Sequence, residues 1–178
     1  MLNIKTSALI IIDIQEKLVN AAKDGNIVAQ NMAKISKAAN ILKIPTIITE
    51  QYPKGLGITV NNIEIINNTE VFEKASFSAL LEPDFAEELQ SLNKKQILIG
   101  GIETHICVLQ TVADLISEGY EVFVLKDCCS SRKEFDHNTG LELMKQYGAK
   151  ITSTEISLFE WLKTSKHENF KEVQALIK

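Results

Sequence analysis

Short apolar runs alternate with segments of helical periodicity along almost the whole chain. The first of these runs is apolar throughout, as is typical of a strand covered on both faces of a parallel sheet. The predicted strands are 8–12, 44–49, 70–72, 97–100, 121–125 and 150–152. Because each run is followed by a longer polar and apolar segment, the pattern favours strands that alternate with helices.

Between the strands, apolar residues recur at intervals of three and four, the period of a helix with one buried face. The longest such series is Val28, Met32, Ile35, Ala39 and Leu42. Pro83 suits the first turn of a later helix. Ser131 and Glu134 have the spacing of a capping box, and Gly148 is expected to end the helix that follows. A last helix is predicted over 170–177.

This alternation predicts a three-layer α/β/α sandwich of the Rossmann-like kind, with a central, mainly parallel six-stranded sheet. The length of 178 residues favours one domain over 1–178. In such sheets ligands bind beyond the carboxyl ends of the strands. Asp13, Glu50, Gln51 and the segment 101–107 follow strands, so we expect them around one crevice. The segment 51–69 is predicted to be a long binding loop.

Net charge and composition argue against several classes of binding partner. The net charge is −4 and Lys and Arg are scattered, which gives no electrostatic footprint for nucleic acid or an anionic membrane. No apolar run approaches the roughly 18 residues that span a bilayer. The apolar N-terminal stretch ends at Asp13 with no small-residue cleavage site, and the three cysteines form no disulfide framework. We therefore expect a cytoplasmic protein with neither nucleic-acid nor membrane partners.

Cys107 is the first candidate for chemistry. It follows Gly100 and Gly101 and is predicted to lie in the first turn of a helix that starts near His105. The helix dipole at that position stabilises a thiolate and lowers the pKa of a cysteine below about 8.5. A small buried core residue is the alternative, and position alone does not decide between them.

Asp13 and Lys74 are the next candidates. An acid directly after a buried apolar run must be paired, and beside a thiol it could accept the thiol proton. Asp13 could instead be the N-cap of a helix starting near Gln15. Lys74 is an ordinary surface lysine unless a cation is needed to keep Asp13 ionised and favour the thiolate.

Three motifs in this order resemble the isochorismatase-like cysteine hydrolase superfamily over nearly the whole chain. They are Ile12-Asp13-Ile14-Gln15, Glu73-Lys74-x-Ser76-Phe77 and Gly101-Ile102-Glu103-Thr104-His105-Ile106-Cys107-Val108. The segments 49–57 and 127–132 make the chain most similar to the short branch of isochorismatase-domain proteins. The resemblance implies a small-molecule substrate, a homo-oligomer, and cleavage of a small amide or related C–N bond.

The resemblance also implies the roles of individual residues. Asp13 is the base, Lys74 the cation and Cys107 the nucleophile that forms a thioester-type intermediate. A cis peptide bond precedes Glu103, and the backbone N–H groups of Glu103 and Cys107 form an oxyanion hole. Because a Thr104 cap would compete for the N–H of Cys107, we expect the Thr104 hydroxyl to bond elsewhere.

Nicotinamidases of this superfamily bind a metal through histidines between the first two triad residues, whereas this chain has none between Asp13 and Lys74. We therefore expect no metal and no cofactor, and we expect His105 to be structural. The residues predicted to line the substrate pocket are Gln15, Gln51, Tyr52, Phe77 and Glu103.

Two other functions compete with the hydrolase. A catalytically idle homologue would serve as a binding or scaffold subunit, although such a protein has no need for Lys74 and Cys107 together. A thiol-based redox protein would use Cys128 and Cys129, which follow the strand 121–125 and are otherwise small packing residues.

Overall fold

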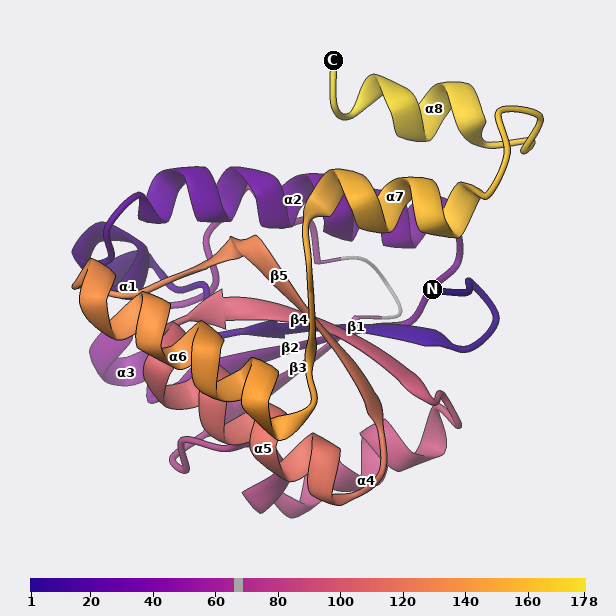
Figure 1. The fold of residues 1–178 in the computed structure, drawn as a ribbon. Coiled ribbons are helices and arrows are strands. Elements are labelled where there is room, and N and C mark those ends of the chain that lie inside the picture. Colours follow the sequence, from indigo (N-terminus) through magenta and orange to yellow (C-terminus); the bar gives the residue numbers. More distant parts are fainter. Residues whose placement is uncertain (66–68) are drawn as a thin grey trace.

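The computed structural model describes residues 1–65 and 69–178, which form a six-stranded sheet with helices on both faces (Figure 1). The strands are β1 (Ser7–Ile12), β2 (Thr46–Gln51), β3 (Glu70–Lys74), β4 (Gln96–Ile102), β5 (Glu121–Ser130) and β6 (Lys150–Thr152). Their order is β3-β2-β1-β4-β5-β6, and every neighbouring pair is parallel. The predicted α/β fold is confirmed.

The helices complete a three-layer sandwich, with α2 and α7 over one face of the sheet and α4, α5 and α6 over the other (Figure 1). The α-helices are α1 (Glu16–Ala21), α2 (Gly25–Ile41), α3 (Pro53–Leu56), α4 (Pro83–Ser91), α5 (Leu109–Ser117), α6 (Glu134–Tyr147), α7 (Thr154–Leu162) and α8 (Phe170–Ala175). A 3-10 turn, η1, spans Ala79–Leu81, and a π-helical turn, η2, spans Thr104–Val108. None of the helices in the described ranges is long and apolar enough to cross a bilayer.

Strand β1 divides the apolar core in two. Ala8, Ile10 and Ile12 belong to the cluster that includes side chains of α4, α5 and α6, whereas Leu9 and Ile11 belong to the cluster that includes side chains of α2 and α7. Successive side chains of a strand point to opposite faces, so this uniformly apolar strand is buried on both.

Strand β5 is longer than predicted. It was expected to end at Leu125 but continues to Ser130, so Cys128 and Cys129 lie inside the strand rather than after it. The register between β4 and β5 shifts in this region, which produces a bulge. The polar residues Lys126 and Asp127 within the bulge explain why the apolar pattern stops early.

Gly100 and Gly101 lie within β4, which continues to Ile102 beyond the predicted end at residue 100. Gly101 has a φ of 151°, and a Cβ there would lie 2.0 Å from the carbonyl oxygen of Ile12. The glycine therefore allows β4 to approach β1 closely, directly before Asp13.

Two helix boundaries differ from the predictions. The capping box is wrong, because the hydroxyl of Ser131 lies 2.9 Å from Nδ1 of His105 and α6 starts after Lys133 without a side-chain cap. Helix α7 was not predicted, although Ser153 accepts a hydrogen bond from the N–H of Ile156 as its N-cap. Gly148 does end α6 in the left-handed conformation.

The predicted binding loop 51–69 is anchored along its first part, and residues 66–68 lie outside the described ranges. The Glu50 carboxylate accepts hydrogen bonds from the N–H and the hydroxyl of Thr59, both at 2.7 Å. The N–H of Val60 donates to the carbonyl of Ile14 at 3.0 Å. These bonds fasten the described part of the loop to the ends of β1 and β2.

Candidate active site

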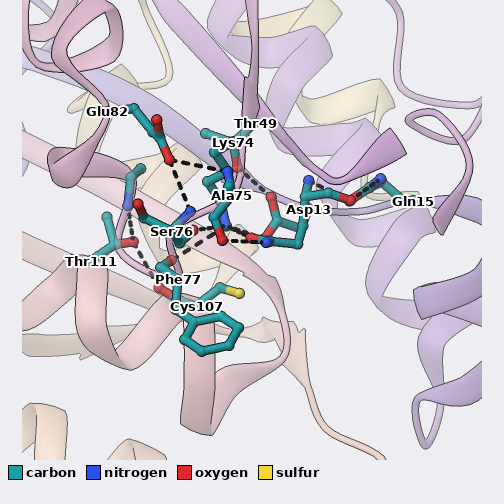
Figure 2. A network of polar contacts seen from close by, with 12 residues as sticks. Asp13, Gln15, Thr49, Lys74, Ala75, Ser76, Phe77, Glu82, Cys107 and Thr111 are labelled. Atoms are coloured by element: carbon teal, nitrogen blue, oxygen red, sulfur yellow. Dashed lines mark hydrogen bonds and ion pairs between the residues drawn. The ribbon is translucent and has the colours of Figure 1, made fainter. Parts of the chain in front are cut away.

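Asp13, Lys74 and Cys107 lie together at the carboxyl edge of the sheet (Figure 2). Asp13 directly follows β1, Lys74 is the last residue of β3, and Cys107 lies in η2 after β4. The side chains of Asp13 and Lys74 have no exposed area, and Cys107 is 6% exposed. Parallel strands bring these residues to one edge despite their separation along the chain.

The Asp13 carboxylate is fixed by the neighbouring strand. Its Oδ1 accepts a hydrogen bond of 2.6 Å from the hydroxyl of Thr49, and its backbone N–H donates to the Thr49 carbonyl at 3.2 Å. The N-cap of α1 is Gln15, not Asp13, so the capping alternative is wrong. The side chain therefore faces the interior of the site.

The Lys74 ammonium has a complete set of acceptors. Its Nζ donates to Oε1 of Gln51 at 2.5 Å and to the carbonyls of Ser76 and Phe77 at 3.2 and 3.3 Å. An ammonium has three N–H donors, and these three acceptors match that number. The same Nζ lies 2.7 Å from Oδ2 of Asp13, which makes a buried ion pair.

Oδ2 of Asp13 keeps its capacity to accept a hydrogen bond. Its contact with Lys74 is an ion pair whose geometry does not meet that of a hydrogen bond, and no other group in the described part of the chain donates to it. Unsatisfied buried polar atoms are rare and call for a specific explanation. A carboxylate oxygen with a free lone pair in the site of a thiol is chemically able to accept the thiol proton.

The pKa of the Cys107 thiol is raised to about 12, mainly by burial. The negative charge of Asp13 also raises this pKa, and its effect is larger than the opposite effect of the Lys74 ammonium. The predicted low pKa is therefore wrong. The expectation considered only the helix that carries the cysteine, whereas desolvation and the carboxylate from β1 act more strongly. The thiol of Cys107 is therefore protonated at neutral pH.

Buried thiols give a pH dependence that can be measured. Burial also raises the pKa of Cys129 from 9.0 to about 12. In this range the unfolded chain loses the proton and the folded chain keeps it, so the free energy of unfolding falls as pH rises through about 9. Between pH 8 and 10, urea unfolding of the wild type should lose about 1 kcal/mol more than that of Cys129→Ala. Lysines and tyrosines titrate in both proteins, so parallel pH curves would contradict this expectation.

Hydrogen bonds within the turn and one contact to a neighbouring helix hold the turn that carries Cys107. The Glu103–Ile102 peptide bond, which the resemblance implies to be cis, is cis. The Glu103 carbonyl accepts the N–H groups of Ile106 and Val108, on either side of Cys107. The Thr104 hydroxyl lies 2.8 Å from Nδ1 of His137 and does not cap the turn, as expected.

Thr111 links this turn to the segment after β3. Its hydroxyl donates to the Cys107 carbonyl at 2.7 Å and accepts the N–H of Ala79 at 3.1 Å. Sequence reasoning missed Thr111 and Thr49. The sequence signal for both is a polar residue on an otherwise apolar strand or helix face. This signal does not identify the group to which the hydroxyl bonds.

The five predicted pocket residues have different surroundings. The Gln15 side chain is buried and bonds both the N–H and the carbonyl of Gln51, so it braces the backbone. The Gln51 side chain holds Lys74, and the Glu103 carboxylate accepts the backbone N–H and Nε of Arg132 at 2.9 and 3.1 Å. Tyr52 and Phe77 are 62% and 52% exposed.

Cys128 and Cys129 are buried side chains of β5. Sγ of Cys128 lies 3.2 Å from the hydroxyl of Thr154, and burial raises the pKa of both thiols. The two side chains pack in different core clusters on opposite faces of the sheet, which favours the packing alternative over a redox pair. Among the described residues, no three His, Cys, Asp or Glu side chains are grouped so that they could hold a metal ion.

Comparison with known proteins identifies the family. The model of the isochorismatase domain matches residues 7–156. Isochorismatase family protein 1A of Dictyostelium discoideum is 42% identical, with 96% of this chain and 85% of that protein covered. Isochorismatase domain-containing protein 2 of Xenopus laevis is 40% identical over 97% of this chain and 84% of its own length.

Solved structures agree with the sequence comparison. A structure described as the MAR1 ribonuclease from Caenorhabditis elegans has a TM-score of 0.94 at 39% identity, covering 99% of this chain and 91% of that one. The YcaC gene product of Escherichia coli, described as an octameric hydrolase of unknown specificity, shares the fold with a TM-score of 0.94 at 22% identity, covering 99% and 88%. The chain belongs to the isochorismatase family.

Proposed function

We propose that this member of a hydrolase superfamily cleaves a small amide or a related C–N bond, with Cys107 as nucleophile and Asp13 as base. One observation carries the proposal: Oδ2 of Asp13, paired with Lys74 and without a hydrogen bond among the described residues, lies in the site of a buried, protonated thiol. Acceptor and proton donor are thus matched in one buried site. An idle scaffold would gain nothing from this arrangement.

The reaction begins with one proton transfer. Asp13 takes the thiol proton as sulfur bonds to the substrate carbonyl carbon, and the carbonyl electrons move to its oxygen. The proposed oxyanion donors are the backbone N–H groups of Glu103 and Cys107. When the carbonyl re-forms, the C–N bond breaks and the proton held by Asp13 goes to the leaving nitrogen.

Hydrolysis of the thioester reverses these roles. Asp13 removes a proton from water, the oxygen of water bonds to the carbonyl carbon, and the C–S bond breaks. The sulfur recovers the proton from Asp13 and the acid leaves. One carboxylate therefore serves both halves of the reaction, with no net change in the protein.

Lys74 acts as a fixed charge in this mechanism and not as a proton donor. Its three N–H groups already bond to Gln51, Ser76 and Phe77. The ammonium pairs with the Asp13 carboxylate in a buried site and offsets part of the cost of forming the Cys107 thiolate. The exposed rings of Tyr52 and Phe77 are the proposed rim of the substrate pocket.

Ammonia release from a panel of small amides tests the proposal. The wild type should release ammonia from at least one amide, and Cys107→Ala should abolish this release while its unfolding curve stays cooperative. Because a similar structure is described as a ribonuclease, RNA cleavage is measured in parallel with both proteins. Cleavage of RNA that depends on Cys107, without any active amide, would replace the amidase assignment.

We further propose that the chain forms a homo-oligomer, in keeping with the octameric hydrolase that shares its fold. Light scattering on the purified protein measures the molar mass. A mass near the 19.9 kDa of one chain would contradict the proposal.

A further inference from the structure

The ammonium of Lys74 is held by the residues that follow it in the chain. After β3 the backbone turns back through residues 75–77, so that the carbonyls of Ser76 and Phe77 accept hydrogen bonds from Nζ of Lys74 (Figure 2). The position of the charge thus depends on the conformation of this short turn. Ala75 and Phe77 are exposed, so packing against the core does not fix the turn by itself.

Glu82 fixes the turn from the side of α4. Its Oε1 accepts the N–H of Ala75 at 3.0 Å and the N–H of Ser76 at 2.9 Å. Glu82 directly precedes Pro83, the first residue of α4, in an extended conformation. The carboxylate is thereby anchored to a helix that packs on the sheet through Phe85.

The carboxylate is charged while it makes these bonds. The hydrogen bond from the N–H of Ser76 lowers the pKa of Glu82 most, followed by further bonds from Ser76 and Ala75, with Lys74 adding a smaller attraction. Charge-assisted hydrogen bonds of this kind are stronger than neutral ones. On the opposite side, Nε2 of Gln51 donates to the carbonyl of Ala75 at 2.8 Å. The turn is therefore held between β2 and α4.

We propose that Glu82 is a positioning residue that holds the turn 75–77 around Lys74 and so sets the electrostatic field at Cys107. The carboxylate does not contact the ion pair directly. It fixes the two N–H groups of the turn, the turn presents its carbonyls to Nζ, and the ammonium favours the Cys107 thiolate. The inference rests on the proposed role of Cys107 as nucleophile.

Alkylation of Cys107 by iodoacetamide tests the inference without any substrate. The rate is measured between pH 7 and 10, with the modified peptide identified by mass spectrometry. Glu82→Ala should react about three- to tenfold more slowly than wild type at each pH, because a rise of half to one unit in the thiol pKa lowers the thiolate fraction by that factor. Glu82→Gln should restore most of the rate, since its amide oxygen can accept both N–H groups.

Controls separate positioning from stability and access. Glu87→Ala removes an exposed carboxylate from the same helix and should alkylate as wild type does. A turn that merely became looser would expose the thiol and speed alkylation, which is the opposite sign. Unchanged rates in Glu82→Ala, or an equal loss in Glu82→Gln, would overturn the inference. Because alkylation needs no amide, a failure to find a substrate leaves this result intact.

Discussion

Replacing Lys74 by methionine is expected to lower the free energy of unfolding by about 3–5 kcal/mol. The substitution keeps most of the side-chain volume but leaves the Asp13 carboxylate buried without its cation, at a position with no exposed area. Removing one partner of a buried ion pair costs about this much, because the remaining charge is desolvated and uncompensated. Urea denaturation followed by circular dichroism measures the loss.

A second substitution separates the charge from the packing. Asp13→Asn in the Lys74→Met background removes the orphaned carboxylate, so most of the lost stability should return. Lys37→Met is the matched control, because Lys37 forms an exposed ion pair of 4.0 Å with Glu64 and should cost less than about 1 kcal/mol. If Lys74→Met lost as little free energy of unfolding as Lys37→Met, the buried pair would not be ionised.

The same neutral pair, Asp13→Asn with Lys74→Met, is expected to fold and yet to lose turnover by a factor on the order of 10⁴. An asparagine amide cannot accept the thiol proton. Burial still raises the pKa of the Cys107 thiol in this variant, and the thiol has lost the carboxylate that is proposed to take its proton. Single-turnover ammonia release from an active amide measures the chemical step.

Folding and chemistry are distinguished by pairing the turnover measurement with the unfolding curve of the same variant. Asp24→Asn neutralises an exposed carboxylate at the start of α2 and should keep the wild-type rate. Turnover of the neutral pair within tenfold of wild type would mean that another group removes the thiol proton. Asp13 would then be structural.

Most strands of the sheet can be predicted from local sequence, because the buried strands are apolar runs that are recognisable without knowledge of their neighbours. Strand β5 shows the limit of this reasoning: Lys126 and Asp127 interrupt the apolar pattern, yet the strand continues through them as a bulge. Helix α7 was missed although Ser153 caps it. Such features depend on which surfaces meet across the fold, and one segment does not contain that information.

The candidate site also contains features that the sequence predicts and features that it does not. Asp13, Lys74 and Cys107 were identified from motifs, and the rule for the carboxyl edge predicted that segments around the first and third would meet. The direction of the Cys107 pKa was wrong because its causes lie on other elements. Glu82 was not singled out, because its role exists only where α4 meets the turn after β3.

The protonated state of Cys107 also bears on how long the protein survives in an oxidising environment. Peroxide attacks the thiolate and not the neutral thiol, and the first oxidation product leads on to irreversible sulfinic and sulfonic acids. In the proposed mechanism the Cys107 thiol stays neutral until a substrate binds and its proton passes to Asp13, so the sulfur spends little time in the vulnerable form. Under this proposal the Asp13 carboxylate determines when the sulfur becomes reactive, and the sulfur is protected from reagents that do not fit the site.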